Sequence, residues 1–355
     1  MNEAAFREVI SGQRRGFAAA TLRTILAAAA GPYALVVALR NEAYNRGWLR
    51  RYRVPVPVVS VGNLTAGGTG KTPVVAFVTE WFQQRGVRVG ILSRGYRAHT
   101  TASNDEKLVL DRLCPNTPHV QNPDRVEGGR IACRQFACQL LILDDGFQHR
   151  RLHRDLDVVL IDATCPWGYG RLLPRGLLRE PVQALRRADL ILLTRVDQCQ
   201  ADAVDRIRET VRRAKAELPI VELAFRPWEL RNTAAETLPP DQLKGRPIAA
   251  FCGIGNPEAF RKTLQACGAD VRAFHSFPDH HDYSDADRNR LAAMARECHA
   301  HWLVATAKDL VKLKETALGG RPLWSLEIRP EVVAGRNILD QRLEKLATKA
   351  KCRGD

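Results

Sequence analysis

The feature that most constrains this chain is a glycine-rich segment between an apolar stretch and a helical pattern. Val56–Val61 is rich in β-branched residues and predicts a buried strand, and a helical pattern then runs as far as Arg85. Between them, residues 62–72 read Gly-Asn-Leu-Thr-Ala-Gly-Gly-Thr-Gly-Lys-Thr. Glycines let backbone N–H groups approach phosphate oxygens, and the start of a helix favours an anion. The order of strand, loop and helix therefore predicts a phosphate-binding loop (P-loop).

Two side chains of this loop have expected roles in nucleotide binding. Lys71 can bridge the β- and γ-phosphates, and the hydroxyl of Thr72 can bind Mg²⁺. The usual pattern begins with a glycine, whereas Thr65 stands at that position, so the loop is a variant. The Gly-Lys-Thr core between a strand and a helix still favours a P-loop over a plain glycine turn. The predicted nucleotide-binding residues are Thr65, Ala66, Gly67, Gly68, Thr69, Gly70, Lys71 and Thr72.

Further apolar stretches alternate with helical patterns and predict a parallel sheet. These stretches are Leu140–Leu143, Val158–Ile161 and Leu190–Leu193. Asp144 and Asp145 follow the first stretch, at the edge where open α/β sheets bind ligands. We predict that one of these two carboxylates holds Mg²⁺ beside the nucleotide, the alternative being a turn closed by an Asp side chain.

Two segments near the predicted sheet bear on the ligands. Thr194-Arg195-Val196-Asp197 has Thr and Arg where a guanine-reading motif has Asn and Lys, which favours ATP over GTP. The loop of residues 170–181 contains three arginines and four leucines. Arginine pairs with phosphate and leucine packs on acyl chains, so this loop fits a phosphorylated, acylated ligand, although its composition also fits a solvated loop.

The N-terminal segment predicts an attachment to membranes. Thr24–Leu39 carries no charge, and arginines, tyrosines and a tryptophan follow it as in an interfacial anchor. Arg23 and the Gly31-Pro32 pair interrupt the apolar run, which argues against a helix that spans the bilayer. A buried Ala-rich core helix and a cleaved signal peptide are the alternatives.

Charge and cysteine content restrict the partners and the compartment. The net charge of +15 requires an anionic partner, which can be nucleic acid, an acidic membrane or a phosphorylated substrate. No block of five consecutive basic residues is present, so a nucleic-acid tail is disfavoured. Nine cysteines without a Cys-x-x-Cys pair predict a reducing cytoplasm and no zinc ribbon.

Taken together, several motifs resemble the tetraacyldisaccharide 4'-kinase family, which phosphorylates the disaccharide precursor of lipid A. The matching blocks are Pro57–Asn63, Gly67–Pro73, Ser93–Tyr96, Asp144–His149, Leu173–Gly176, Leu178–Pro181, Phe277–His281 and Thr306–Asp309. The resemblance implies an α/β fold with a P-loop NTPase-like parallel sheet domain and a second, smaller α/β domain. We expect a membrane-associated helix over residues 1–45, the kinase domain over 46–230 and the smaller domain over 231–355.

The resemblance also implies the catalytic residues. Asp105 corresponds to the catalytic base of the family and Glu106 to a residue near the metal, although Asn104 stands where the family has glycine. Without the resemblance, these residues predict only an acidic turn before a strand over Lys107–Leu110. His280 corresponds to the histidine that supports the base.

The predicted loop position of His280 depends on the helix that follows it. Ser284 and Asp287 predict a capping box that starts this helix. Judged without the resemblance, His280 and His281 are two solvated loop histidines. Thr306–Asp309 predicts another junction between a strand and a helix, without a definite role.

We therefore predict an ATP-dependent kinase that uses Mg²⁺ and phosphorylates the 4'-hydroxyl of tetraacyldisaccharide 1-phosphate at the cytoplasmic face of the inner membrane. A P-loop ATPase acting on another anionic partner is the alternative; we expect no nucleic-acid partner and no obligate protein partner. The predicted catalytic residues are Lys71, Asp105 and His280, and the predicted metal-binding residues are Thr72, Glu106, Asp144 and Asp145. The predicted substrate-binding residues are Asn63, Arg94, Arg125, Arg175, Arg179 and Glu180.

Overall fold

The chain divides into two compact units. The computed structural model describes residues 3–95 and 105–352, so Tyr96 and Asn104 lie outside the described residues. The first unit comprises Met1–Arg94, Asn116–Ala224 and Val332–Asp355, and the second comprises Gly95–Pro115 and Phe225–Glu331. These units differ from the predicted domain ranges of 46–230 and 231–355. Gly95–Pro115 belongs to the second unit, and Val332–Asp355 belongs to the first.

The first unit is built on a parallel sheet. Its strands lie in the order β7, β6, β5, β1, β4, β2, β3. Their bounds are β7 Ile220–Arg231, β6 Leu190–Thr194, β5 Leu156–Asp162, β1 Val58–Asn63, β4 Leu140–Asp144, β2 Val89–Ser93 and β3 His119–Gln121. All neighbouring pairs in this order are parallel, as predicted. Every residue of β1, β4, β5 and β6 is buried, which is why their sequences are mostly apolar and do not alternate between apolar and polar residues.

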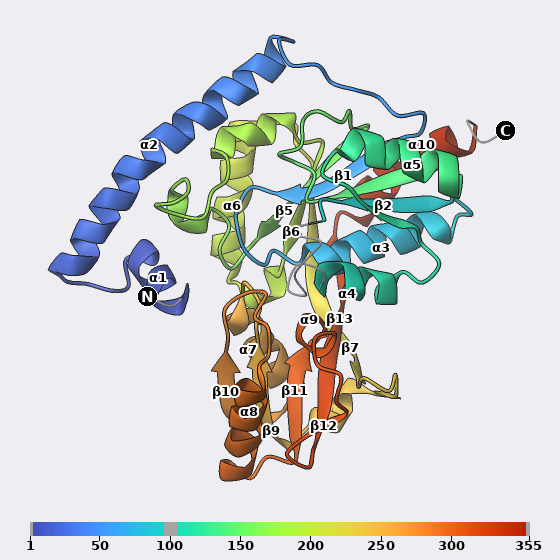
Figure 1. The fold of residues 1–355 in the computed structure, drawn as a ribbon. Helices are drawn as coiled ribbons and strands as arrows, with labels where there is room; N and C mark the ends of the chain where they lie inside the picture. Colours follow the sequence, from blue (N-terminus) through green and yellow to red (C-terminus); the bar gives the residue numbers. More distant parts are fainter. Residues whose placement is uncertain (1–2, 96–104, 353–355) are drawn as a thin grey trace. The chain divides into compact units, whose positions relative to one another are not determined.

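Helices and short 3₁₀ turns connect these strands. The helices of the first unit are α1 Glu3–Ser11, α2 Phe17–Asn45, α3 Lys71–Gln83, α5 Arg125–Phe136, α6 Ala201–Ala214 and α10 Arg336–Lys351. The 3₁₀ turns are η2 Gly168–Gly170, η3 Val182–Arg187 and η4 Val196–Gln198. Helices α3 and α5 pack beside β1, β2 and β4 (Figure 1). This packing fixes the loop between β1 and α3 at the carboxyl edge of the sheet.

Helix α2 is long and mostly exposed. It continues through Arg23 and Pro32, so the interruptions of the apolar run do not break the helix (Figure 1). It is long and apolar enough to cross a membrane by length and composition, and only 6% of its most apolar window is buried. Phe17, Leu35 and Val36 are among its exposed apolar side chains.

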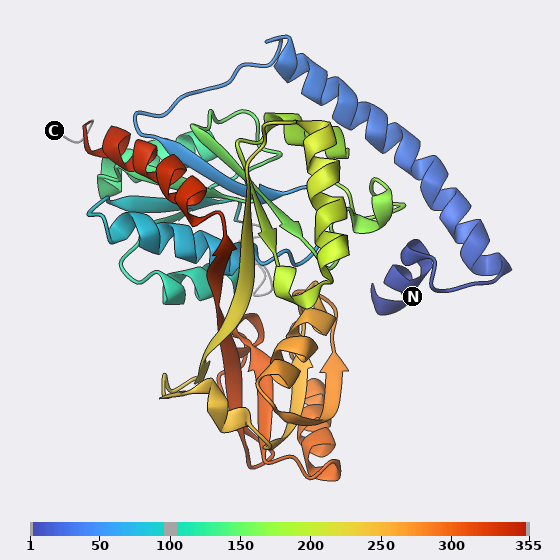
Figure 2. The ribbon, with the colours of Figure 1, turned by 180° about the vertical axis from the view of Figure 1, so that it is seen from behind.

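The second unit contains strands of the same sheet, which has 13 strands in the described part of the chain. Its strands lie in the order β10, β9, β11, β13, β7, and β7 and β13 are neighbours (Figure 2). The bounds are β9 Pro247–Cys252, β10 Asp270–Ser276, β11 Trp302–Thr306 and β13 Arg321–Ala334, with short strands β8 Thr237–Leu238 and β12 Ala317–Leu318. Its helices are α4 Asp105–Leu113, α7 Pro257–Ala266, α8 Asp285–Glu297 and α9 Ala307–Leu310, with the 3₁₀ turn η5 Pro240–Leu243. Apolar side chains pack into cores that include Phe251, Leu291 and Leu303.

One predicted element of the second unit is wrong. Lys107–Leu110, predicted as a strand, lies inside helix α4. Asp105, Val109 and Leu110 are buried while Leu108 and Asp111 are exposed, which is the spacing of a helix with one buried face. Asp105 and Glu106 occupy the first turn, where carboxylates favour a helix start. A short apolar run of this length cannot distinguish a strand from a helix by periodicity alone.

Candidate active site

The loop between β1 and α3 has the geometry of a P-loop. Gly67 and Gly70 have φ of 115° and 83°, a backbone region that side-chain-bearing residues rarely adopt. Helix α3 begins at Lys71, directly after Gly70, so its first amides lie next to the loop. Among the predicted loop residues, Thr65, Thr69 and Thr72 are buried. The predicted strand, loop and helix are all present.

Lys71 is held by two oxygens of the first unit. Its Nζ lies 3.5 Å from Asp145 Oδ1 and 3.4 Å from Asn63 Oδ1. Asp145 also accepts hydrogen bonds of 2.7 and 2.9 Å from Arg179 Nη1. Burial raises the pKa of Asp145, but Lys71 and Arg179 outweigh burial and hold it well below its usual range. The carboxylate is therefore ionised and already paired with cations.

Two glycines allow the segment that follows β4 to pack closely against the P-loop strand β1. A Cβ on Gly62 would lie 2.7 Å from the backbone N of Phe147, and a Cβ on Gly146 would lie 2.6 Å from Ser60 Oγ. Only glycine allows this close approach. As a result Asp144, which is buried at the end of β4, lies on the strand next to β1.

The segment Leu177–Glu180 pairs with the P-loop backbone. The amide of Ala66 donates to Leu177 O, and the amide of Arg179 donates to Leu64 O, both at 2.7 Å. Arg195, which directly follows β6, also supports this loop. Its Nη1 donates a hydrogen bond to Gly68 O at 3.2 Å. Sequence reasoning missed these contacts, since nothing local in either segment indicates the other.

The predicted substrate-binding residues occupy varied settings. Asn63 is buried and its amide donates to Thr65 O and Thr69 Oγ1, so it also fixes the P-loop. Arg94 is exposed after β2, and Arg125 is buried at the start of α5. Arg175 Nη1 donates to Ile10 O at 2.8 Å, near the end of α1.

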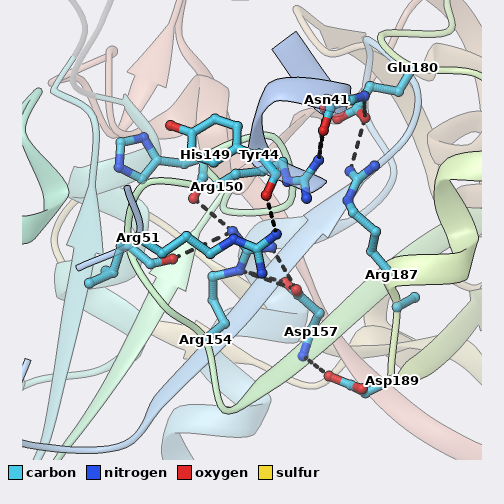
Figure 3. A network of polar contacts seen from close by, with 12 residues as sticks. Asn41, Tyr44, Arg51, His149, Arg150, Arg154, Asp157, Glu180, Arg187 and Asp189 are labelled. Atoms are coloured by element: carbon cyan, nitrogen blue, oxygen red, sulfur yellow. Dashed lines mark hydrogen bonds and ion pairs between the residues drawn. The ribbon is translucent and has the colours of Figure 1, made fainter. Parts of the chain in front are cut away.

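Glu180 and its neighbours form a buried polar network in the first unit. Glu180 is fully buried, and its Oε2 lies 2.9 Å from Arg187 Nη2 and 2.7 Å from Asn41 Nδ2 (Figure 3). Arg150 lies in the same network, where burial and then the arginines around it lower its pKa to about 10. The network links helix α2 to the loop that pairs with the P-loop.

In the second unit, Asp105 and His280 form a close pair. His280 Nδ1 lies 3.0 Å from Asp105 Oδ2 and 3.1 Å from Oδ1, and Lys312 Nζ lies 3.1 Å from Oδ2. Asp105 is 1% exposed. Burial raises the pKa of Asp105, but the hydrogen bond from His280 and the charges of the nearby lysines hold it well below its usual range. The predicted pairing of Asp105 with His280 is present.

The loop that carries His280 is itself constrained. His280 has φ of 61°, and its amide lies 3.3 Å from Gly253 O and 3.1 Å from Asp279 Oδ1. The predicted capping box of Ser284 and Asp287 begins α8 just after this loop. Hydrogen bonding to Asp105 raises the pKa of His280 against the effect of burial.

Helix α9 explains the block Thr306–Asp309, whose role the sequence left open. Lys308 Nζ lies 2.7 Å from Glu106 Oε1, so α9 holds this carboxylate while Lys312 holds Asp105. Asp309 is fully buried and accepts hydrogen bonds from Tyr283 Oη at 2.7 Å and from Gly253 N at 2.9 Å. Helix α9 and Lys312, which lies just after it, therefore support both acidic residues and the loop of His280.

The predicted metal-binding residues belong to both units. Thr72, Asp144 and Asp145 belong to the first unit, whereas Glu106 belongs to the second. Within residues 3–95 and 105–352, no three His, Cys, Asp or Glu side chains form a metal-binding group.

The first unit therefore has the features of a P-loop phosphotransferase: a strand, a glycine loop, a helix that begins at a lysine, and an ionised carboxylate beside that lysine. A model of the family Tetraacyldisaccharide-1-P 4'-kinase matches residues 22–348. The chain belongs to this family. It is an ATP-dependent kinase that phosphorylates the 4'-hydroxyl of tetraacyldisaccharide 1-phosphate in lipid A biosynthesis, as the sequence motifs predicted.

Individual relatives agree with this assignment. A tetraacyldisaccharide 4'-kinase from Geobacter metallireducens is 41% identical over 306 residues, which cover 81% of this chain and 88% of that protein. One from Anaeromyxobacter dehalogenans is 38% identical over 334 residues, covering 89% and 88%. The crystal structure of LpxK from Aquifex aeolicus in complex with ATP is similar with a TM-score of 0.71 at 32% identity, covering 92% of this chain and 99% of that one.

Proposed function

We propose that the P-loop of the first unit holds ATP and that Lys71 draws charge from its γ-phosphate during transfer to the 4'-hydroxyl. The observation that carries this proposal is the position of Lys71, which begins α3 beside Gly70 and pairs with Asp145. Phosphoryl transfer is catalysed mostly by positioning and by neutralising charge on the transferred group. The other loop residues, Thr65–Gly70 and Thr72, would contribute backbone amides and hydroxyls to the phosphates.

Asp105 is the proposed base for the 4'-hydroxyl, and His280 is the proposed positioning residue. A buried carboxylate with a low pKa is ionised at neutral pH and so can accept a proton or orient the hydroxyl. His280 fixes the carboxylate by its hydrogen bond, and Lys312 stabilises its charge.

Mg²⁺ is the proposed metal. Hard oxygen donors suit this ion, and Thr72, Asp144, Asp145 and Glu106 provide a hydroxyl and carboxylates. When bound, the ion neutralises charge on the β- and γ-phosphates. The few protein ligands fit Mg²⁺, which keeps waters and phosphate oxygens among its ligands.

The lipid substrate and the membrane account for the apolar and basic surfaces. Helix α2 exposes Leu35, Val36 and Leu39, and the arginines and Trp48 that follow it suit a headgroup layer. We propose that this helix holds the enzyme at the cytoplasmic face of the inner membrane. Arg94, Arg125, Arg175 and Arg179 are proposed to bind the phosphorylated sugar, and Asn63 and Glu180 remain proposed substrate residues.

The test uses the full-length enzyme in mixed micelles with labelled ATP and purified tetraacyldisaccharide 1-phosphate. The expected product carries a new labelled phosphate at the 4' position. Lys71→Ala should abolish transfer, whereas Lys345→Ala, at an exposed position of α10, should retain it. ATP consumption without lipid acceptor, and no labelled sugar, would instead support a P-loop ATPase acting on another anionic partner.

A further inference from the structure

One stripe of α2 faces the first unit. Tyr33, Val37, Asn41 and Asn45 recur every fourth residue, so they lie along one side of the helix. Val37 is buried, and Tyr33 and Asn41 are half-buried, whereas the leucines at 35 and 39 are exposed. The helix thus has one docked side and one free apolar side. We call the four docked residues the docking stripe.

The docking stripe contacts the loop of Arg179 and Glu180. Tyr33 Oη donates to Arg179 O at 2.9 Å. Asn41 Nδ2 donates to Glu180 Oε2 at 2.7 Å (Figure 3). Glu180 is fully buried, so its carboxylate depends on Asn41 and Arg187 in place of water. A contact with a buried charge is more sensitive to substitution than an exposed one.

Arg150 provides a second attachment for the docking stripe. It is 3% exposed, and it donates to Asn41 O at 2.9 Å and to Asn45 Oδ1 at 2.8 Å. Arg150 lies five residues after Asp145 in the sequence. The helix is therefore attached to both segments that approach the P-loop, the one after β4 and the one that contains Glu180.

The loop contacted by the docking stripe is in direct contact with the phosphate-binding residues. The amide of Arg179 donates to Leu64 O at 2.7 Å. The guanidinium of Arg179 binds Asp145, which lies 3.5 Å from Lys71 Nζ. A continuous set of contacts therefore runs from α2 through Arg179 and Asp145 to Lys71.

We propose that Tyr33 and Asn41 of α2 are positioning residues for phosphoryl transfer, Tyr33 through the backbone of Arg179 and Asn41 through the adjacent Glu180. The apolar helix is then more than a membrane tether, because its docking sets the position of the Arg179–Asp145–Lys71 contacts. This inference rests on the proposed role of Lys71 in the kinase reaction. Misplacement of a phosphate-binding group by about 1 Å can cost up to about a hundredfold in rate.

The experiment is a double-mutant cycle on the full-length enzyme in mixed micelles, under single-turnover conditions. Asn41→Leu removes the donor at similar volume, Arg179→Gln removes the cation, and the double variant combines them. Asn41→Leu is expected to lower the rate of transfer roughly tenfold. The KM for the lipid and the binding to vesicles should equal those of the unmodified enzyme. In the Arg179→Gln background, Asn41→Leu should cause no further loss.

Controls separate positioning from loss of structure. Glu42→Gln changes the adjacent, exposed position of α2 and should retain full activity. Asn41→Gln keeps the carboxamide and should recover part of the rate, and Tyr33→Phe should give a smaller loss in the same cycle. Thermal unfolding midpoints and ATP binding are measured for each variant.

Two results would overturn the inference. The first is that the rate losses of Asn41→Leu and Arg179→Gln multiply in the double variant. The second is that Asn41→Leu changes only the binding to vesicles or the KM for the lipid. Suppose that the unmodified enzyme transfers phosphate and Lys71→Ala does not. If the rate losses of Asn41→Leu and Arg179→Gln then multiply in the double variant, only the inference about α2 fails. Absence of transfer by the unmodified enzyme would refute the proposed function itself.

Discussion

Asp105 and Asp145 are buried or paired carboxylates that neighbouring cations keep ionised. Lys71 and Arg179 lower the pKa of Asp145, and His280 with two lysines lowers that of Asp105, in both cases against the effect of burial. A carboxylate that stays charged in a dry setting interacts strongly with nearby groups. At the scale of single residues, the proposed mechanism depends on these charges.

Replacing Asp105 tests its role as the base. Asp105→Asn keeps the shape but removes the charge, so we expect turnover to fall by roughly a hundredfold or more while ATP binding is retained. Asp111→Asn, on the exposed side of the same helix, serves as the control. Turnover is followed with labelled ATP, and ATP affinity by equilibrium binding. Near-normal turnover of Asp105→Asn would remove it from the mechanism.

The Asp105–His280 pair also predicts a dependence on pH. The pKa of His280 is raised above its ordinary value of 6.5 by the hydrogen bond to Asp105. Because the folded-state pKa of His280 is raised, its protonation contributes stability that is fully present below pH 6.5 and is lost as pH rises through the folded-state pKa.

Titration of His280 by nuclear magnetic resonance measures this directly. We expect a pKa above 6.5 in the unmodified chain and a lower value in Asp105→Asn, because the hydrogen-bond acceptor loses its charge. His281→Gln is a control for the signal assignment. An unchanged pKa in Asp105→Asn would show that the pair does not control His280.

At the scale of elements, α2 combines two surfaces with different expected partners. Its docking stripe contacts Arg179, Glu180 and Arg150, whereas Leu35, Val36 and Leu39 are 60%, 64% and 61% exposed. Exposed apolar side chains in such a row indicate a surface that another apolar phase covers. A bilayer interface fits a long helix with aromatic and basic residues at its end.

Charge on the exposed face should weaken membrane binding. For Leu35→Glu combined with Leu39→Glu, we expect binding to anionic vesicles to fall by at least about tenfold, because two apolar contacts are lost and two repulsive charges are gained. As a control, Ile338→Glu introduces one glutamate at an exposed apolar residue of α10 and should leave binding intact. Vesicle sedimentation measures both. Unchanged sedimentation of the double variant would point to a different membrane-binding surface.

At the scale of the whole chain, the two units are not contiguous in sequence. The C-terminal helix α10 belongs to the first unit with the P-loop, and the segment that begins with Asp105 belongs to the second. In the first unit, Trp81 Nε1 on α3 donates to Asp340 Oδ1 at 2.9 Å. Leu339, Leu343 and Leu346 of α10 are buried in the same unit.

Removing α10 should therefore destabilise the P-loop unit. Each buried leucine contributes about 1.5–3 kcal/mol, so deletion of residues 336–355 should lower the free energy of unfolding by several kcal/mol. Urea unfolding followed by tryptophan fluorescence and by ATP binding measures this loss. Lys345→Ala, exposed on the same helix, should have little effect. An unchanged midpoint after deletion would show that α10 contributes little to the first unit.

Most of the local structure could be predicted from the sequence. The strands that end at Asn63, Asp144, Asp162 and Thr194 are mostly apolar without a strict alternation, which is typical of buried parallel strands. The P-loop follows from glycines next to a strand and a helix. The exception is α4, where Asp105–Leu113 is too short for periodicity to distinguish strand from helix.

Sequence by itself determined the class of the chain, because a P-loop, acidic strand ends and an apolar N-terminal helix are each encoded within a few residues. The family resemblance implied that His280 supports Asp105, 175 residues away in the chain, whereas the support of both acidic residues by Lys312 and α9 became known only from the folded structure. The tertiary structure likewise decided that α10 joins the first unit and that Asn41 binds Glu180. Such contacts depend on how distant segments pack, and local periodicity carries no information about that packing.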